Sequence, residues 1–277
     1  VQERAELIML SDIAGYVGAD TCGCLLAIRQ DQQEEISLMI DIGTNGEMVL
    51  GNRERMVTCS TAAGPAFEGA KIECGMRGAA GAVDHVKYED GKWNYTTVGN
   101  KPAVGLCGSG LIDLVAGLLD AGMLDENGVL RSGQEKQGVF ILVLPERGGN
   151  ERGVYLTQKD LGEVQLAKAA IAAGIQMLME RLGITEDDIC SVYIAGAFGN
   201  YMDPVSAGKI GLFPATLVKK VKPVGNAAGE GAKIALVNEK EMLEMDELVR
   251  KIEFVELAAS ADFQDHFIDE LGFETGE

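Results

Sequence analysis

The stretch from residue 41 to residue 51 constrains the fold of this chain more than any other part of its sequence. It reads Asp41-Ile-Gly-Thr-Asn-Gly-Glu-Met-Val-Leu-Gly51, and it follows the apolar run Ile36-Ser-Leu-Met-Ile40. An Asn-Gly pair between two apolar runs is a strong short-range signal for a β-hairpin. The stretch therefore predicts two strands, at 36–43 and 46–51, that are joined by a tight turn.

The residues of this turn are suited to holding a metal-bound phosphate. Gly43 and Gly46 would let backbone N–H groups approach an anion closely, and the turn between them, Thr44-Asn45, adds a hydroxyl. Asp41, at the end of a buried strand, could hold Mg²⁺ directly or through its water shell. An ordinary Asn-Gly hairpin, kept for its shape, explains the same residues. The choice between the two depends on the rest of the chain.

Composition limits the classes of function. The chain has 277 residues, of which 47% are hydrophobic, and this is typical of a globular protein with one large core or two lobes. It has 43 acidic and 24 basic residues, which give a formal net charge of −19. Such a charge repels nucleic acid and anionic membranes, so neither is an expected partner. A nucleotide site would need local donors and Mg²⁺.

Neither a membrane span nor a metal site formed by cysteine and histidine is expected. The longest apolar run, 111–119, is interrupted by Asp113 and is far shorter than a span. The chain begins without Met and shows no signal peptide, so we expect a fragment of a longer cytoplasmic protein. Cys22 and Cys24 are the only closely spaced pair among six cysteines, which favours small buried thiols over an iron–sulfur centre on this chain.

The remaining sequence alternates strands with helices. Thr157-Gln-Lys-Asp160 resembles a capping box, the long helix behind it has an apolar face, and Gly183 follows its end. Further strands are predicted at 55–62, 83–88, 93–98, 139–144, 189–195, 218–224 and 251–257, and helices at 21–28, 105–119, 161–182, after Pro204, after Gly225 and at 261–271. Three hairpin-joined strands followed by this alternation predict an α/β fold, a mixed sheet with helices on both faces.

Two glycine-rich segments follow later strands. Ala195-Gly-Ala-Phe-Gly-Asn200 follows the strand predicted at 189–195, and Gly225-Asn226 opens the next helix. Either segment could let a flat ligand lie against the backbone, or could simply end a strand. Glu68 and Asp203 lie near these turns and could orient water or a metal ion, although acids solvated on loops explain them too.

These features in this order resemble the nucleotide-binding lobe of the actin, sugar-kinase and heat-shock-chaperone ATPase superfamily. The sequence is most similar to the reductive activators of corrinoid proteins. The matching stretches are Ile13-Ala-Gly-Tyr-Val-Gly-Ala-Asp20, Ile40-Asp-Ile-Gly-Thr-Asn-Gly-Glu47, Ala63-Gly-Pro-Ala-Phe-Glu-Gly69, Cys107-Gly-Ser-Gly-Leu-Ile-Asp113, Leu156-Thr-Gln-Lys-Asp160, Val164-Gln-Leu-Ala-Lys-Ala169 and Ala195-Gly-Ala-Phe-Gly-Asn200. They extend over nearly the whole chain.

The resemblance implies a ribonuclease-H-like, actin-like ATPase lobe that binds ATP and Mg²⁺. Residues 35–277 would form this lobe, and residues 1–34 would be a lead-in segment that completes a preceding lobe. Asp41 would anchor Mg²⁺, and Asp41 and Glu68 are the candidate catalytic residues. The remaining candidate binding residues are those of the phosphate turn (Gly43, Thr44, Asn45, Gly46), of the adenosine turn (Gly196, Ala197, Phe198, Gly199, Asn200) and of the last helix start (Gly225, Asn226).

The resemblance also implies a function for the longer protein. Such proteins use ATP to return inactive Co(II) corrinoid proteins to Co(I), with electrons from a [2Fe–2S] domain that would lie outside this chain. The family's earlier Asp-Gly-Thr-Thr-type phosphate loop does not occur before residue 41, so this chain resembles the second half of a two-lobed ATP clamp and could be inactive alone. Two alternatives stay open: a docking or homodimerisation module for a corrinoid protein, and a small-molecule kinase of the same superfamily.

Overall fold

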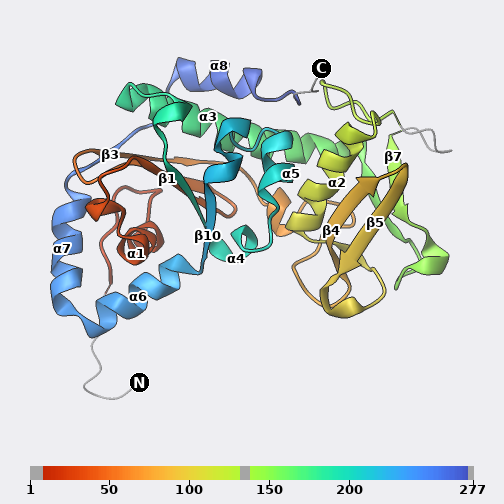
Figure 1. Ribbon diagram of the computed structural model, residues 1–277, viewed down its shortest axis with the longest axis horizontal. Helices are drawn as coiled ribbons and strands as arrows, with labels where there is room; N and C mark the ends of the chain where they lie inside the picture. The colour runs from red at the N-terminus through yellow and green to blue at the C-terminus, as the bar shows by residue number, and fades with distance from the viewer. Residues whose placement is uncertain (1–8, 132–137, 274–277) are drawn as a thin grey trace.

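The structure is a computed structural model that describes residues 9–131 and 138–273 (Figure 1). Its larger part is a six-stranded mixed sheet with the strand order β10-β9-β1-β2-β3-β11. The strands are β1 (Ser37–Ile42), β2 (Gly46–Gly51), β3 (Met56–Thr61), β9 (Ser191–Ala195), β10 (Val221–Gly225) and β11 (Ile252–Phe254). The first three form an antiparallel meander, and β9, β10 and β11 join it as parallel strands at its two edges.

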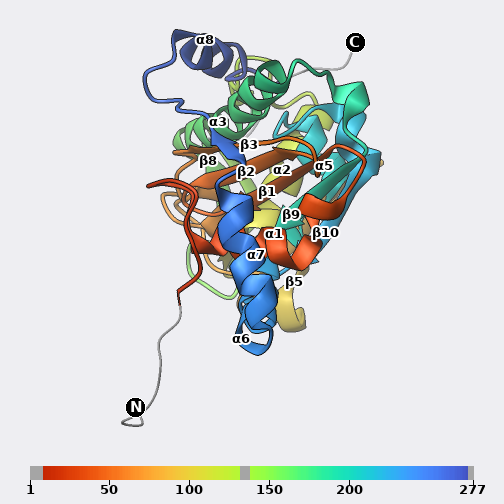
Figure 2. The same cartoon turned by 90° about the vertical axis from the view of Figure 1, so that its left-hand side faces the viewer.

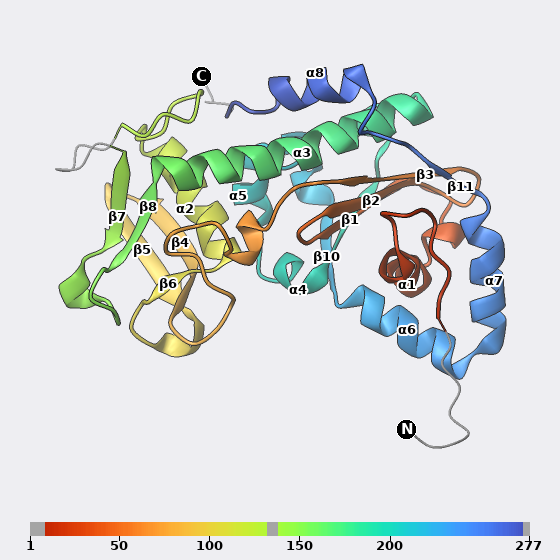
Figure 3. The same ribbon diagram turned by 180° about the vertical axis from the view of Figure 1, so that it is seen from behind.

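Helices cover both faces of this sheet (Figures 2 and 3). One face packs against α3 (Gln158–Leu182), with α8 (Ala261–Asp269) on top of it, and the other against α1 (Ala19–Ile28), α6 (Ala227–Val237) and α7 (Glu239–Val249). Alternation along β1 explains the two layers: Leu38 and Ile40 are buried in the core on the α3 side, and Met39 is buried in the core on the α1 side.

A smaller module is inserted between β3 and α3, at the right of Figure 1. It contains a three-stranded sheet, the helix α2 and a two-stranded ribbon. The elements are β4 (Ala82–Glu89), β5 (Lys92–Thr97), β6 (Gly105–Leu106), α2 (Gly108–Asp120), β7 (Val139–Val143) and β8 (Val154–Thr157). The module continues directly into α3, whose first turn is closed by the capping box of Thr157 and Asp160. It therefore shares the long helix with the main sheet.

Shorter elements complete the fold. Two short helices, α4 (Gly196–Gly199) and α5 (Pro204–Lys209), follow β9. Single 3₁₀ turns occur at Gln30–Gln32, Ala66–Glu68, Val98–Asn100, Pro145–Arg147 and Glu186–Asp188, and a longer one at Ala215–Lys220. No helix among the described residues is both long and apolar enough to span a bilayer.

Most predicted elements are confirmed, and the exceptions lie in the last third of the chain and near the ribbon. The strand predicted at 218–224 begins as a 3₁₀ turn, and β10 covers only 221–225. The strand predicted at 251–257 pairs only at 252–254, because the chain then leaves the short edge it shares with β3. Strand β8 and helix α7 were not predicted.

Helix α1 lies beneath the main sheet and crosses α6 at very short range. Gly23 of α1 and Gly231 of α6 face each other, so a Cβ atom on Gly231 would overlap the carbonyl oxygen of Gly23. Cys22, Cys24 and Leu25 are fully buried there in the second core. Small residues therefore set the distance between the two helices. The prediction that residues 1–34 complete a preceding lobe stays a prediction.

Candidate functional site

Three of the predicted site residues meet at the carboxyl ends of adjacent parallel strands. Asp41 of β1 lies beside Ala195 of β9, and Gly225 of β10 lies beside the same Ala195 on its other side. Gly196 follows Ala195 directly. In open α/β sheets, ligands bind outside the carboxyl ends of the strands, so this edge is where a site is expected.

The backbone of Gly196 lies against the carboxylate of Asp41. A Cβ atom on Gly196 would lie 2.9 Å from Asp41 Oδ1, closer than a carbon and an oxygen can pack. Gly196 also has φ +87°, a conformation that side-chain-bearing residues rarely adopt. Both the contact and the backbone angle therefore require glycine at this position.

Asp41 belongs to an acidic group that the sequence did not reveal. Asp41 and Glu47 are directly opposite each other in the β1–β2 hairpin, so their side chains share one face of the sheet. Asp20 lies in the first turn of α1, and its charge acts on both. Burial, followed by the charge of Asp20, raises the pKa of Asp41. Burial and the charges of Asp20 and Asp41 raise the pKa of Glu47 to about 7.

Asp20 and Glu47 are thus the main residues that sequence reasoning missed at this site. Both were quoted within matching stretches, but neither was assigned a role. Asp20 is an acid in the first turn of a helix, a common position that the helix dipole favours by itself. Only the packing of α1 under the hairpin relates it to Asp41, 21 residues further along the chain.

The tip of the hairpin offers fewer free donors than the sequence indicated. The amide of Gly43 donates to the carbonyl oxygen of Asn45 (2.9 Å), so the turn itself uses this donor. Gly46 is buried in β2 against the side chains of Thr61 and Ile171. Among the described residues, no hydrogen-bond acceptor faces the amides of Thr44 and Asn45. An anion at the tip would therefore use these two amides, rather than those of the glycines that flank them.

Thr44 and Glu68 come together, as the prediction of a shared site requires. The Thr44 hydroxyl donates to Glu68 Oε1 (2.6 Å), and the amide of Gly64 donates to the carbonyl oxygen of Thr44 (2.8 Å). Glu68 is otherwise exposed. Asp203, in contrast, caps α5 by accepting from the amides of Val205 and Ser206. Its role in the fold is that of a helix cap.

The segment predicted as an adenosine turn is the single helical turn α4. The ring of Phe198 stacks on Phe67, with a centroid distance of 5.8 Å and an interplanar angle of 13°. The first residue of α2, Gly108, lies under both, and a Cβ atom there would lie 2.7 Å from the Phe198 ring. Gly199 is buried against Ile194. The side chain of Ala197 lies outside the described part of the chain.

The last predicted residues also have structural partners. The Asn226 side chain caps α6 by accepting from the amide of Gly229 (3.0 Å). Gly225 has φ +62°, and a Cβ atom there would lie 3.1 Å from the side-chain nitrogen of the exposed Asn200. Asn200 and Gly225 are therefore neighbours, and the start of α6 faces the same sheet edge as Gly196.

A cavity of about 670 Å³ opens beside the hairpin tip. Its size suits a small organic ligand such as a nucleotide. It brings together Gly43, Glu68 and Phe198 from the predicted site with residues that sequence reasoning assigned to no site. The lining residues are Ile42, Gly43, Phe67, Glu68, Met76, Arg77, Gly78, Asp84, Val98, Gly99, Cys107, Gly108, Ser109, Phe198 and Tyr201. The start of α2 is part of one wall.

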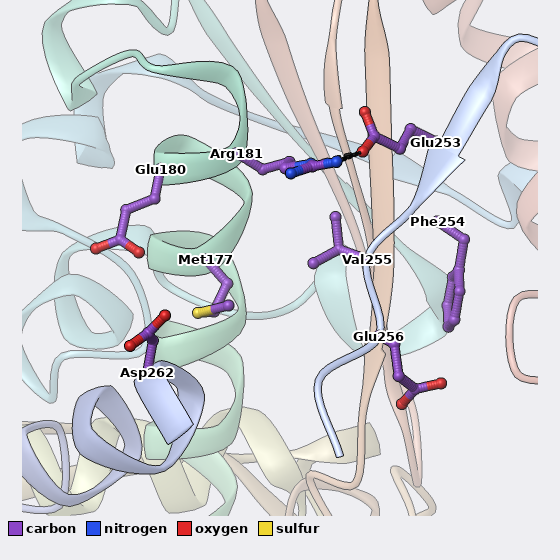
Figure 4. A pocket seen from close by; sticks show the side chains of 8 residues that line it. All are labelled: Met177, Glu180, Arg181, Glu253, Phe254, Val255, Glu256 and Asp262. Carbon is purple, nitrogen blue, oxygen red and sulfur yellow. Dashed lines mark hydrogen bonds and ion pairs between the residues drawn. The ribbon is translucent and has the colours of Figure 1, made fainter. Parts of the chain in front are cut away.

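Another hollow, of about 360 Å³, lies far along the sheet between α3, β11 and α8 (Figure 4). Arg181 of α3 pairs with Glu253 of β11 at one wall, and Glu180 and Asp262 are at the other. None of the predicted site residues lines it. It is therefore separate from the site at the carboxyl edge.

The described residues contain no cluster of three or more histidine, cysteine and acidic side chains arranged to hold a metal ion. Burial raises the pKa of the Cys22 thiol to about 12, and burial also raises those of Cys24 and Cys59. Burial therefore keeps these thiols protonated. A hard cation held by one or two carboxylates, waters and a phosphate remains compatible with the acidic group.

A family model and two curated relatives match nearly the whole of this chain. A family model described as the C-terminal domain of RACo, the ASKHA domain, matches residues 35–277. The corrinoid activation enzyme RamQ of Eubacterium limosum is 37% identical over 97% of this chain and 47% of its own length. The [Co(II) methylated amine-specific corrinoid protein] reductase of Methanosarcina barkeri is 29% identical over 98% of this chain and 52% of its own length.

A solved structure gives the same result. The reductive activator for corrinoid, iron-sulfur protein superposes with a TM-score of 0.88 at 39% sequence identity, over 95% of this chain and 44% of that one. The chain thus spans about half the length of each of these relatives.

Proposed function

Because this chain belongs to the family of the C-terminal ASKHA domain of RACo, we propose that it is the nucleotide-binding part of an ATP-dependent reductive activator of corrinoid proteins. The longer protein would use ATP to return a Co(II) corrinoid protein to Co(I). The names of the relatives support the corrinoid protein as partner. The [2Fe–2S] centre that supplies the electron would lie outside this chain, since the described cysteines do not form a cluster site.

One observation carries the nucleotide proposal: the hairpin tip has an acidic group on one side and a ligand-sized cavity on the other. Asp41 and Glu47, with Asp20, form the acidic group, and Glu68 is at the mouth of the cavity. ATP has the matching polarity, a metal-bound triphosphate at one end and an apolar base at the other. The amides of Thr44 and Asn45 at the hairpin tip have no acceptor among the described residues.

The residues present fit Mg²⁺. Asp41 and Glu47 are partly buried, repel each other and have raised pKa values, which favours a hard divalent cation that neutralises them. Asp41 would hold the ion, directly or through water, and Asp20 and Glu47 would orient the water shell. When bound, Mg²⁺ neutralises charge on the phosphate oxygens. Gly196 has no side chain, so the carboxylate of Asp41 beside it is not crowded by a Cβ atom.

The residues of the cavity would bind and orient the nucleoside. Phe198 and Phe67 supply an apolar wall, and Arg77 contributes a cation at the rim. Thr44 holds Glu68 by a hydrogen bond, which positions this carboxylate at the hairpin tip. Glu68 could there orient an attacking water. ATP binding would then act as a switch, because it would draw the hairpin and the inserted module together around one ligand.

Calorimetric titration of this chain with Mg·ATP tests the proposal. We expect saturable binding to one site, and Asp41→Asn should weaken it about tenfold or more, because the anchor of the metal is lost. The matched control is Asp187→Asn. Asp187 is exposed in the 3₁₀ turn before β9, at the amino end of the sheet, and its replacement should leave binding unchanged.

The same titration can refute the proposal. Equal affinity for the wild type and Asp41→Asn would remove Asp41 from the site. Equal weakening by both variants would mean that the loss of affinity is not specific to Asp41. In the longer protein, corrinoid reduction at an undiminished rate without ATP would refute the coupling to ATP.

A further inference from the structure

A second cleft, of about 820 Å³, lies between the inserted module and the segment that leads from α4 into α5. Its walls are the β4–β5 hairpin, the middle of α2 and the segment 200–206. It meets the cavity described above only at Tyr201, which lines both. No residue of the acidic group around Asp41 contributes to it.

The cleft is acidic. Glu89, Asp113, Asp120 and Asp203 line it, against a single lysine, Lys87, and one histidine. Lys87 is already paired with Glu89 across the solvent-exposed face of β4. Asp120 is paired with Lys209 of α5. Four acids against these two lysines still leave the cleft with a surplus of negative charge.

At the floor of the cleft, one oxygen of a buried carboxylate lacks a donor. Asp113 is 5% exposed, its Oδ2 atom accepts from the amide of Val86 (3.3 Å), and it pairs with His85 Nδ1 (3.1 Å). The Ser206 hydroxyl lies beside both Asp113 and Asp203, but it donates its one proton to Asp203 Oδ2 (3.0 Å). Asp113 Oδ1 is left without a hydrogen-bond partner. Its charge adds to the field at the floor, and burial of such a charge is costly without a cation nearby.

The mouth of the cleft carries exposed aromatic and apolar side chains. Tyr201 is 65% exposed, Tyr95 is 39% exposed, and Val205 is 61% exposed beside them. Tyrosines next to acids are typical of surfaces that bind arginine or lysine, because the ring faces and the carboxylates both attract the cation.

The net charge of the chain limits which classes of ligand can bind in the cleft. Nucleic acid and anionic membranes would be repelled by an acidic cleft on a protein of net charge −19, and a second copy of the chain has the same unfavourable charge. We propose that the cleft binds an arginine or lysine side chain on a basic segment of a protein partner. The cation would enter between Tyr95 and Tyr201 and face Asp113 and Asp203, and it would compete with Lys209 for Asp120.

The identity of that partner, but not the binding itself, rests on the proposed function. A corrinoid protein would be the partner, and the cleft suits such a role because Tyr201 is shared with the candidate nucleotide cavity. The segment 196–206 joins the two sites within eleven residues of chain. A partner docked in the cleft would thus touch the segment that a nucleotide touches from the other side.

Fluorescence anisotropy of this chain with a labelled peptide of alternating arginine and alanine tests the proposal. The comparison peptide has citrulline at each arginine, which keeps the shape and removes the charge. We expect binding of the arginine peptide that weakens with salt, and no binding of the citrulline peptide. Tyr95→Ala and Asp120→Asn should each weaken binding about threefold, and together about tenfold.

Two matched variants control for the general charge and hydrophobicity of the surface. Tyr16→Ala removes a tyrosine outside the cleft that is even more exposed than Tyr95, and Asp187→Asn removes an exposed acid outside it. Both should leave the affinity unchanged. Equal weakening by these controls, equal binding of the citrulline peptide, or no binding of either peptide would overturn the proposal. The measurement uses no nucleotide, so its failure leaves the nucleotide proposal standing.

Discussion

Replacing Glu47 by glutamine should make the protein more stable at alkaline pH. Glu47 lies opposite Asp41 in the hairpin, and its hydrogen-bond partner in the structure is the Ser60 hydroxyl, which donates to it (3.3 Å). Its pKa is raised from 4.5 to about 7 by burial and by the charges of Asp20 and Asp41. Glutamine keeps the shape and can still accept from Ser60, but it removes the charge.

The sign follows from which state holds the proton. The folded state binds the Glu47 proton more tightly, so the stability linked to this group is complete below pH 4.5 and is lost as the pH rises through 7. A full shift of this size corresponds to about 3.4 kcal/mol. Glu47 is only partly buried, so solvent screening reduces this to about 1–2 kcal/mol. Glutamine at this position avoids that loss.

Urea unfolding of both proteins between pH 5.5 and 8.5, without Mg²⁺, measures the effect. Near its isoelectric pH of about 4.5 the protein would precipitate, so the chosen range lies above that pH. The free energy of unfolding of Glu47→Gln should exceed that of the wild type by an amount that grows by about 1 kcal/mol across the range. Glu146→Gln, at an exposed glutamate, should show no such trend. A pH-independent difference between Glu47→Gln and the wild type would refute the reasoning.

Three further substitutions test other parts of the structure. Gly231→Ala should destabilise the protein by about 1–3 kcal/mol in urea unfolding, because the new Cβ would overlap the facing helix α1. The control Gly162→Ala has open space around it in α3, so it should be neutral or should stabilise the protein by up to about 1 kcal/mol. Gly108→Ala should abolish Mg·ATP binding in calorimetry, because the new Cβ would displace the aromatic wall of the cavity. The control Gly78→Ala, in the same cavity lining but with open space around it, should bind Mg·ATP as the wild type does. Equal affinities of the two variants for Mg·ATP would contradict the prediction. Thr157→Ala should lower the free energy of unfolding by about 1 kcal/mol through loss of the α3 cap, and an unchanged thermal midpoint would argue against it.

Local patterns predicted the hairpin and α3 because their signals lie within a few residues. Asn45-Gly46 specifies the turn between β1 and β2, and the Thr157–Asp160 capping box specifies the start of α3. The predicted actin-like ATPase lobe, a mixed sheet covered on both faces, is confirmed by the family model and by the superposed reductive activator. These features depend on short-range chemistry or on motifs spread along the whole chain.

Relations between distant residues could not be predicted in the same way. The effect of Asp20 on Glu47 depends on how closely α1 packs under the sheet, and the two glycines at the α1–α6 crossing set that distance. Phe198 was predicted to contact a base, but its stacking partner in the fold is Phe67, 131 residues earlier. The roles of the predicted site residues stay predictions until binding is measured.

The strand order has a consequence for how the protein is made. The meander of β1, β2 and β3 is complete after residue 61, but its flanking strands β9 and β11 begin only at residues 191 and 252. During synthesis, both edges of this apolar sheet therefore stay unpaired until well over a hundred further residues have been made. Such long-range strand pairing is slow. Exposed edges of this kind recruit other chains. We expect the nascent chain to depend on chaperones until β11 has emerged, and the sheet edge that carries Asp41 to form only after β10 is in place.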